Sequence, residues 1–275
     1  MAVVLAYGFQ VLSQYAFNLS AIDSGIPFTE LGYDKMREQS SNKILTVAND
    51  KSTFKKDKIA VVTLSGVIQK ADGLCSFGTQ TKGEQLLAVK EDVIGAILKI
   101  DSGGGYMDGA ESFVADMREF GKPIVALSSY AGSAAYMIAS EADQILATSD
   151  LAEFGSIGVY YELNSQFKAM YKKYIQTAYS TESPDKNANF RQWVESENQD
   201  ESLRGFIQAA TKADEMFMKM VEQNRQSLNK EMKGQTLAGG MFFAKDAQKR
   251  GLIDGQGNNQ DAVSLVQKLS RIKNK

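Results

Sequence analysis

The chain has 275 residues, of which 43% are hydrophobic and 23% are charged, a composition typical of a globular protein with a substantial core. Its 31 basic and 33 acidic side chains leave a formal net charge of −2, so bulk charge gives no reason to expect nucleic acid or an anionic membrane surface as a partner. The sequence contains no histidine and only one cysteine, Cys75, which excludes an internal disulfide. Without histidine or an EF-hand-like acidic loop, we expect no metal or other cofactor.

The first 57 residues are predicted to be a lead-in segment or arm, because they end in a polar, charged run. Their apolar beginning has no Lys or Arg before Lys35, unlike a secretory signal. No stretch approaches the roughly 18 apolar residues that a membrane span requires. We therefore expect a soluble protein of the cytoplasm, a compartment that suits a single thiol.

From residue 58 onward, short β-rich runs alternate with amphipathic helical stretches, which predicts an α/β fold with a buried parallel sheet. The expected strands are 59–64, 93–100, 123–128, 144–148 and 175–179, and the expected helices are 83–90, 108–120, 133–140 and 162–174. Residues 188–230 carry apolar side chains at helical spacing and predict a long helical arm or hairpin. The predicted organisation is an arm over 1–57, an α/β core over 58–187, and a helical arm with a closing segment over 188–275.

The first candidate site follows the strand at 93–100, where Asp101-Ser-Gly-Gly-Gly105 leads into a helix. Glycine tolerates positive φ and has no Cβ, so the N–H groups of Gly104 and Gly105 can converge on an anion or an oxyanion. A tight strand-to-helix turn explains the glycines equally well. A dinucleotide-binding loop is excluded, because G-x-G-x-x-G requires glycine at Asp108.

The second candidate site lies one α/β unit later, in Tyr130-Ala-Gly-Ser-Ala-Ala-Tyr136, where Ser133 is expected to open a helix. There the N–H of Ala134 can join Gly104 or Gly105 in an oxyanion hole. Alternatively, Ser133 is an ordinary helix N-cap. If Ser133 is a nucleophile, the absence of histidine makes a lysine held neutral the leading candidate for its base.

Two other patterns with a nucleophilic serine do not fit the chain. The nucleophile elbow G-x-S-x-G would need glycine at Ala131 and Ala135. The S-x-x-K pattern of penicillin-binding proteins recurs along this lysine-rich chain, but the accompanying K-T-G and S-D-N motifs are absent.

Four blocks, in this order, resemble signature segments of the signal peptide peptidase (protease IV) family of serine proteases. They are residues 101–105, 130–136, 141–147 (EADQILA) and 154–159 (FGSIGV), and residues 244–254 (AKDAQKRGLID) are similar to the family's closing segment. The resemblance implies a crotonase-like or Clp-protease-like α/β superhelix of strand-strand-helix units that forms homo-oligomers. It also implies a Ser/Lys dyad without histidine.

The resemblance gives roles to individual residues. Ser133 matches the nucleophile, with the oxyanion hole at Gly104, Gly105 and Ala134. The base lysine lies downstream of the G-S-I-G-V block, at a spacing that lands here on Lys186.

The serine of the same block, Ser156, matches the residue that orients the lysine. An effective base has to be uncharged, so Lys186 must be buried and kept away from Glu182 and Asp185. A solvated loop lysine and a turn serine are the structural alternatives. Lys172 and Lys173 are rival bases, but they fall on the polar face of a predicted helix.

Two departures from the family pattern affect the expected cleft. Gly103 replaces the proline of D-S-P-G-G, and Ala134 and Ala135 replace the glycines that follow the serine. The added methyl groups are expected to narrow the cleft. We therefore expect small or extended substrate residues, held by β-type pairing near Gly104.

The resemblance implies a serine endopeptidase that cleaves polypeptides. A chain of this length without a span or leader is similar to the head maturation proteases of tailed bacteriophages, which cut scaffold and capsid proteins in the prohead of the infected cell. A bacterial cytoplasmic peptidase and an inactive scaffold or assembly protein of the same fold are the alternatives. A crotonase-type acyl-CoA enzyme would instead need Glu111 or Glu141 in the cleft.

Overall fold

The computed structural model describes residues 58–73 and 78–273, which form two compact units. We call residues 159–216 the helical unit, and residues 58–73, 78–158 and 217–273 the sheet unit. The predicted lead-in over 1–57 lies outside the described residues. The predicted boundary between core and helical arm, at residues 187 and 188, falls inside the helical unit.

The sheet unit is built on a mixed sheet whose strands, within the described residues, number seven. Its parallel strands run in the order β1 (Ile59–Ile68), β2 (Gly95–Gly105), β3 (Ile124–Gly132), β4 (Gln144–Ala147) and β7 (Gly255–Gln256). The first half of β3 pairs with β4, and its last three residues pair in parallel with β5 (Glu153–Gly155). The last strand, β6 (Met241–Phe243), pairs antiparallel with β5.

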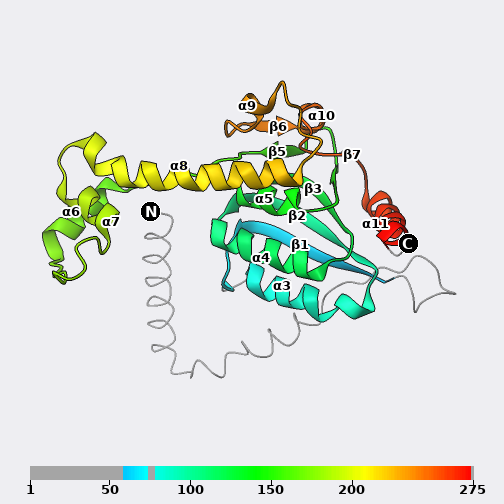
Figure 1. Ribbon diagram of the computed structural model, residues 1–275, viewed down its shortest axis with the longest axis horizontal. Coiled ribbons are helices and arrows are strands. Elements are labelled where there is room, and N and C mark those ends of the chain that lie inside the picture. The colour runs from blue at the N-terminus through cyan, green and yellow to red at the C-terminus, as the bar shows by residue number, and fades with distance from the viewer. Residues whose placement is uncertain (1–57, 74–77, 274–275) are drawn as a thin grey trace, which may run out of the picture. The chain divides into compact units, whose positions relative to one another are not determined.

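Helices cover both faces of this sheet, as Figure 1 shows. One face packs against α3 (Thr79–Ala88), α4 (Met107–Phe120) and α5 (Ala134–Ser140), and the other against α11 (Asn259–Lys273). Alternate residues of β2 serve the two cores: Leu98 lies in the larger cluster with Phe113, and Ile97 lies in the smaller cluster with Val263. Both faces are therefore apolar, as expected for parallel strands. The short elements are η2 (Lys90–Asp92), α9 (Lys233–Thr236) and α10 (Ala244–Lys249).

The helical unit contains α6 (Ser165–Tyr174), α7 (Ala188–Glu195) and the first part of α8 (Gln199–Asn224). Its core is aromatic: Phe190 and Trp193 are buried, and the ring of Phe167 stacks on Trp193 with 6.5 Å between centroids. The last part of α8 belongs to the sheet unit, where Phe217 and Val221 are buried in the larger cluster.

The predicted α/β class is confirmed, and so are the predicted helices and strands between residues 59 and 174. The predicted strand over 175–179 is wrong, because this stretch has no regular secondary structure. Its β-branched and aromatic residues favour a strand, but they meet no sheet edge. Instead the N–H of Ile175 donates to the carbonyl oxygen of Tyr171 at the end of α6, and the guanidinium of Arg191 lies 5.0 Å from the ring centroid of Tyr179.

The predicted helical stretch over 188–230 is two helices, because the chain leaves the helical conformation at residues 196–198. The hydroxyl of Ser196 donates to the carbonyl oxygen of Asn198 at 3.2 Å, and the side-chain oxygen of Asn198 accepts the N–H of Glu201 at 3.1 Å. Short polar side chains that bond to nearby backbone compete with helix hydrogen bonds, so they end α7 and start α8.

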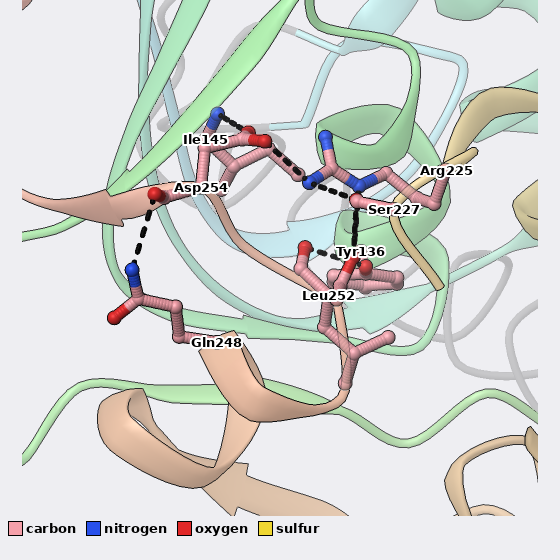
Figure 2. A network of polar contacts seen from close by, with 8 residues as sticks. Tyr136, Ile145, Arg225, Ser227, Gln248, Leu252 and Asp254 are labelled. Atoms are coloured by element: carbon pink, nitrogen blue, oxygen red, sulfur yellow. Dashed lines mark hydrogen bonds and ion pairs between the residues drawn. The ribbon is translucent and has the colours of Figure 1, made fainter. Parts of the chain in front are cut away.

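A partly buried ion pair joins Arg225, the residue after α8, to the segment that closes the sheet unit, residues 244–254 (Figure 2). Arg225 is 4% exposed, and its guanidinium binds Asp254 Oδ1 at 2.9 Å and the carbonyl oxygen of Gly251 at 3.3 Å. The other carboxylate oxygen of Asp254 accepts the N–H of Ile145, in β4, at 2.7 Å. The same segment accepts a hydrogen bond from α5, where the hydroxyl of Tyr136 donates to the carbonyl oxygen of Leu252 at 2.8 Å.

Tyr136 is fully buried three residues after Ser133. Burial raises the pKa of its hydroxyl, so this group remains a neutral donor at all ordinary pH values. The closing segment therefore fixes α5, the helix that starts next to Ser133, to both α8 and the sheet.

Replacing Arg225 with methionine is expected to lower the free energy of unfolding by about 3–5 kcal/mol, because it leaves the Asp254 carboxylate without its buried partner. The matched control is Lys245→Met, which removes an exposed ion pair with Asp150, and it is expected to cause no measurable change. Urea unfolding of both variants measures the difference. Equal stability of the two variants would contradict the role of Arg225.

Candidate active site

Two neighbouring parallel strands end at the same level of the sheet, and a serine follows each of them. β3 and β5 pair Gly132 with Gly155, so the next residues are Ser133 and Ser156. The N–H of Ser133 donates to the carbonyl oxygen of Gly155 at 2.9 Å, and the N–H of Ser156 donates to the carbonyl oxygen of Gly240 at 2.8 Å. The structure thus brings two of the residues singled out in the sequence to one place.

Both serines have backbone conformations that residues with side chains rarely adopt. Ser133 has φ 50° and ψ −126°, and Ser156 has φ 51°. Conformations of this kind cost roughly 1–3 kcal/mol and cluster at functional sites. A strained strand-to-helix turn is also the feature that exposes the nucleophile of α/β-hydrolases. The missing glycines of G-x-S-x-G therefore exclude that motif but not a strained turn at Ser133.

The side chain of Ser133 does not cap α5, because its hydroxyl makes no hydrogen bond to the first helical turn. Its carbonyl oxygen accepts the N–H of Met137 at 2.9 Å, so the backbone alone starts the helix. Ser133 is partly exposed, whereas every residue of α5 is buried. The N-cap explanation is therefore not supported, and the hydroxyl lies at the accessible end of a buried helix.

The glycine turn at the end of β2 packs directly against Ser133. Gly104 has φ +107°, and a Cβ on this residue would lie 2.7 Å from the Cβ of Ser133 and 2.9 Å from the backbone nitrogen of Ala134. Only glycine fits there, on conformational and steric grounds. Because Ala134 is the first residue of α5, no carbonyl of its own helix accepts its N–H. Two of the three expected oxyanion donors therefore lie beside the serine.

The N–H of Gly104 is held by Ser102, a residue to which the sequence analysis gave no role. Ser102 is 2% exposed, accepts the N–H of Gly104 at 3.1 Å, and donates its hydroxyl to the carbonyl oxygen of Gly66 at 2.5 Å. Of the expected oxyanion donors, Gly104 therefore already has a partner for its N–H within the chain. The third expected donor, Gly105, packs against β1, where a Cβ would lie 2.2 Å from the carbonyl oxygen of Ile68.

Lys186 lies in the helical unit, in the turn that precedes α7, whereas both serines lie in the sheet unit. Its N–H donates to the carbonyl oxygen of Ser183 at 3.1 Å, and its side chain is exposed. The contact between Lys186 and Ser133 therefore stays a prediction, as does the desolvation that a neutral lysine requires.

Other lysines considered as bases have partners of their own. Lys172 forms an ion pair with Glu197 at 2.5 Å, and the amine of Lys173 lies 5.0 Å from the ring centroid of Tyr174. Lys82, in α3, was not considered from the sequence. Burial lowers the pKa of its amine, and the nearby Asp72 carboxylate acts in the opposite direction.

The two carboxylates that an acyl-CoA enzyme would need are engaged elsewhere. Glu141 forms an ion pair with Arg118 at 2.8 Å and accepts the side-chain amide of Asn224 at 2.9 Å. Glu111 lines an open cavity of about 450 Å³ on the outer side of α4, together with Lys70 and Arg118. Neither arrangement supports an acyl-CoA site at Ser133.

Among residues 58–73 and 78–273, no three Cys, Asp or Glu side chains gather in a way that could hold a metal ion. In the same part of the chain, no helix combines the length and hydropathy needed to cross a membrane.

Comparison with known proteins identifies relatives over most of the chain. Residues 116–273 match the sequence profile of peptidase family S49. A protein of Methanocaldococcus jannaschii is 29% identical over 238 residues, which cover 80% of this chain and 73% of the relative. The chloroplastic serine protease SPPA of Arabidopsis thaliana is 28% identical, and the match covers 79% of this chain and 33% of that protein. Protease 4 of Haemophilus influenzae is 29% identical, and the match covers 78% of this chain and 35% of that protein. The chain thus spans about a third of the length of these last two relatives.

Similar solved structures include a mutant of ClpP1 from Listeria monocytogenes, with a TM-score of 0.46, 11% identity, and coverage of 74% of this chain and 94% of the other. A mutant of the 1510-N membrane-bound stomatin-specific protease also has a TM-score of 0.46, with 15% identity and coverage of 75% and 83%.

The crowding at Gly104 predicts that Gly104→Ala destabilises the protein more than Gly66→Ala. Both glycines have positive φ, but a Cβ at Gly66 would have no neighbour within 4 Å. Gly66→Ala is therefore expected to cost only the strain of its backbone conformation, about 1–2 kcal/mol. At Gly104 the collision with Ser133 and Ala134 adds to a similar strain. Denaturant unfolding compares the stability of the two variants. Equal losses in the free energy of unfolding would show that the glycine turn is not in tight contact with Ser133.

Proposed function

Because the chain belongs to peptidase family S49, we propose that it is a serine endopeptidase whose nucleophile is Ser133. The observation that carries this proposal is the strained, partly exposed serine at the end of β3. Next to it lies the N–H of Ala134, which no carbonyl of α5 accepts. A serine used only for structure has no need of this conformation, since an N-cap serine adopts a relaxed extended backbone.

In the proposed reaction, Ser133 Oγ attacks the carbonyl carbon of the scissile peptide bond while the neutral amine of Lys186 takes its proton. The N–H of Ala134 donates to the oxyanion that forms, and Gly104 or Gly105 is the expected second donor. For Gly104 this requires its N–H to leave the hydroxyl oxygen of Ser102. The lysine then gives its proton to the leaving amine, and an acyl group remains on Ser133. Water, deprotonated by the same lysine, releases the acyl group and restores the enzyme.

We propose that Ser156 orients the lysine through its hydroxyl. The pairing of β3 with β5 supports this role, because it places the backbone of Ser156 one residue beyond the Gly155 carbonyl that Ser133 binds. An environment with two hydroxyls and no carboxylate would also favour the neutral form of the lysine amine. Since the side chain of Lys186 is exposed, bound substrate or a neighbouring copy in a homo-oligomer would have to complete its desolvation.

For the natural substrate, we propose the scaffold and capsid proteins of a phage prohead, on the basis of the resemblance to head maturation proteases. A bacterial cytoplasmic protease of the signal peptide peptidase type is the second candidate, and it is supported by the similarity to the serine protease SPPA of Arabidopsis thaliana and Protease 4 of Haemophilus influenzae. Incubation with unfolded casein and with a purified scaffold protein separates the two, because only the second candidate should degrade both at similar rates.

The dyad is tested with the substrate that the wild type degrades, casein or scaffold protein, by measuring its cleavage by Ser133→Ala, Lys186→Ala and the double variant. Each single substitution is expected to lower kcat by a factor on the order of 10³ or more, and the double variant should be no worse, because the two residues act as a unit. Ser156→Ala is expected to cause a smaller loss, because this residue acts through the lysine. The controls are Lys173→Ala and Lys82→Ala, which should retain wild-type activity.

Each contrary outcome has a specific meaning. Unchanged cleavage by Ser133→Ala would remove Ser133 from the mechanism. Loss of activity in Lys82→Ala, together with an active Lys186→Ala, would move the base to α3. A wild-type protein without any activity would favour the inactive scaffold of the same fold.

A further inference from the structure

We propose that Met241, on β6, limits the size of the substrate side chain that lies next to Ser133. This inference rests on the proposed function, because it assumes that Ser133 is acylated by the substrate. It concerns the residue that contributes the attacked carbonyl, and it predicts a preference for small side chains at that position.

The sequence suggested another cause for such a preference, namely the methyl groups of Ala134 and Ala135. In the structure, both methyl groups lie in the larger hydrophobic cluster, with exposed fractions of 1% and 0%. They point into the core and cannot line a cleft. A limit on substrate size must therefore come from another side chain.

The side chain of Met241 lies close to Gly132, the residue before Ser133, because the intervening strand position is also a glycine. Gly132, Gly155 and Met241 pair in register across β3, β5 and β6. Of these three residues only Met241 has a side chain, and its sulfur lies 3.5 Å from the point where a Cβ of Gly132 would stand. The thioether thus covers the residue that immediately precedes Ser133.

Gly132 itself is buried, but a partly exposed apolar side chain lies on each side of it. Met241 is only partly buried, and Tyr130, two residues before Gly132 on β3, is 38% exposed. Residues two apart on a strand share a face, so Tyr130 and the vacant side of Gly132 face the same way. A Cβ on Gly103 would lie 3.2 Å from the ring of Tyr130. A Cβ on Gly132 would lie 3.1 Å from the carbonyl oxygen of Gly103. Glycine backbone, flanked by the side chains of Tyr130 and Met241, therefore lies beside the nucleophile.

The side chain that limits the size of the substrate residue has to come from β6, because β5 has no room for a side chain at Gly155. A Cβ on Gly155 would lie 2.3 Å from the carbonyl oxygen of Gly240. Methionine is unbranched and flexible, so its side chain covers the glycines, and the inference is that only a small substrate side chain fits next to it. Shortening it to alanine would open space for a large one. Differences of one or a few methylene groups in an apolar site change kcat/KM by about 10–200-fold.

The experiment is digestion of a peptide library by wild-type protein and Met241→Ala, with cleavage sites identified by mass spectrometry. We expect the wild type to favour Ala, Ser or Gly before the scissile bond, and Met241→Ala to raise cleavage after Leu or Phe relative to Ala by about 10-fold or more. The matched control is Phe243→Ala. Phe243 lies on the same strand, is 55% exposed and pairs with Glu153, two rows farther from Ser133 than Met241, so this variant should keep the wild-type preference.

Several outcomes would overturn the inference. If Met241→Ala is active and keeps the wild-type preference, Met241 does not limit the site, and the proposed function stands. If Met241→Ala does not fold, Met241→Val takes its place, and an unchanged preference again overturns the inference. If Ser133→Ala cleaves the library as the wild type does, the proposed function fails, and the inference fails with it.

Discussion

The hydrogen bond from the N–H of Ser133 to the carbonyl oxygen of Gly155 is the contact on which the candidate site depends. It continues the pairing of β3 with β5 by one residue and holds Ser133 in a conformation that costs free energy. Neighbouring bonds offset this cost, because the carbonyl of Ser133 starts α5 and the N–H of Ser156 binds Gly240. Glycines make the arrangement possible, since a side chain at Gly104 or Gly155 would collide with the backbone around the serines.

Segments far apart in the sequence stabilise this turn. The hydroxyl of Tyr136 and the carbonyl oxygen of Leu252 fix α5 to the closing segment, and the pair of Arg225 and Asp254 fixes that segment to α8 and β4. The strand β6 is supported in a similar way, because the guanidinium of Arg250 lies 3.9 Å from the ring centroid of Phe242. The strained serine is thus connected through α5 to the closing segment, α8 and β4, a set of contacts that suits the preorganisation needed for the proposed catalytic role.

Lys186 lies in the helical unit, and its contact with Ser133 stays a prediction. Much of the remaining organisation could be predicted from the sequence, because alternating strands and helices with glycine and serine at strand ends place Ser133, Ser156 and the glycine turn at one edge of a parallel sheet. The positive φ of Ser133 and the capture of Gly104 by Ser102 could not, since both arise from backbone packing between strands. Met241 was missed for a related reason: β6 has three residues and pairs antiparallel with a strand some ninety positions earlier, an arrangement without a local sequence signal. The strand predicted over 175–179 is absent, which shows that β-propensity does not form a strand without a partner strand to pair with.

The central claim is that Ser133, and no other serine, is chemically reactive. Treatment with a fluorophosphonate, followed by digestion and mass spectrometry, measures this directly, because the reagent forms a stable adduct with an activated serine hydroxyl. The account predicts one adduct per chain on Ser133, lost when the protein is unfolded before treatment. An adduct on a different serine, or none in the folded protein, would contradict it.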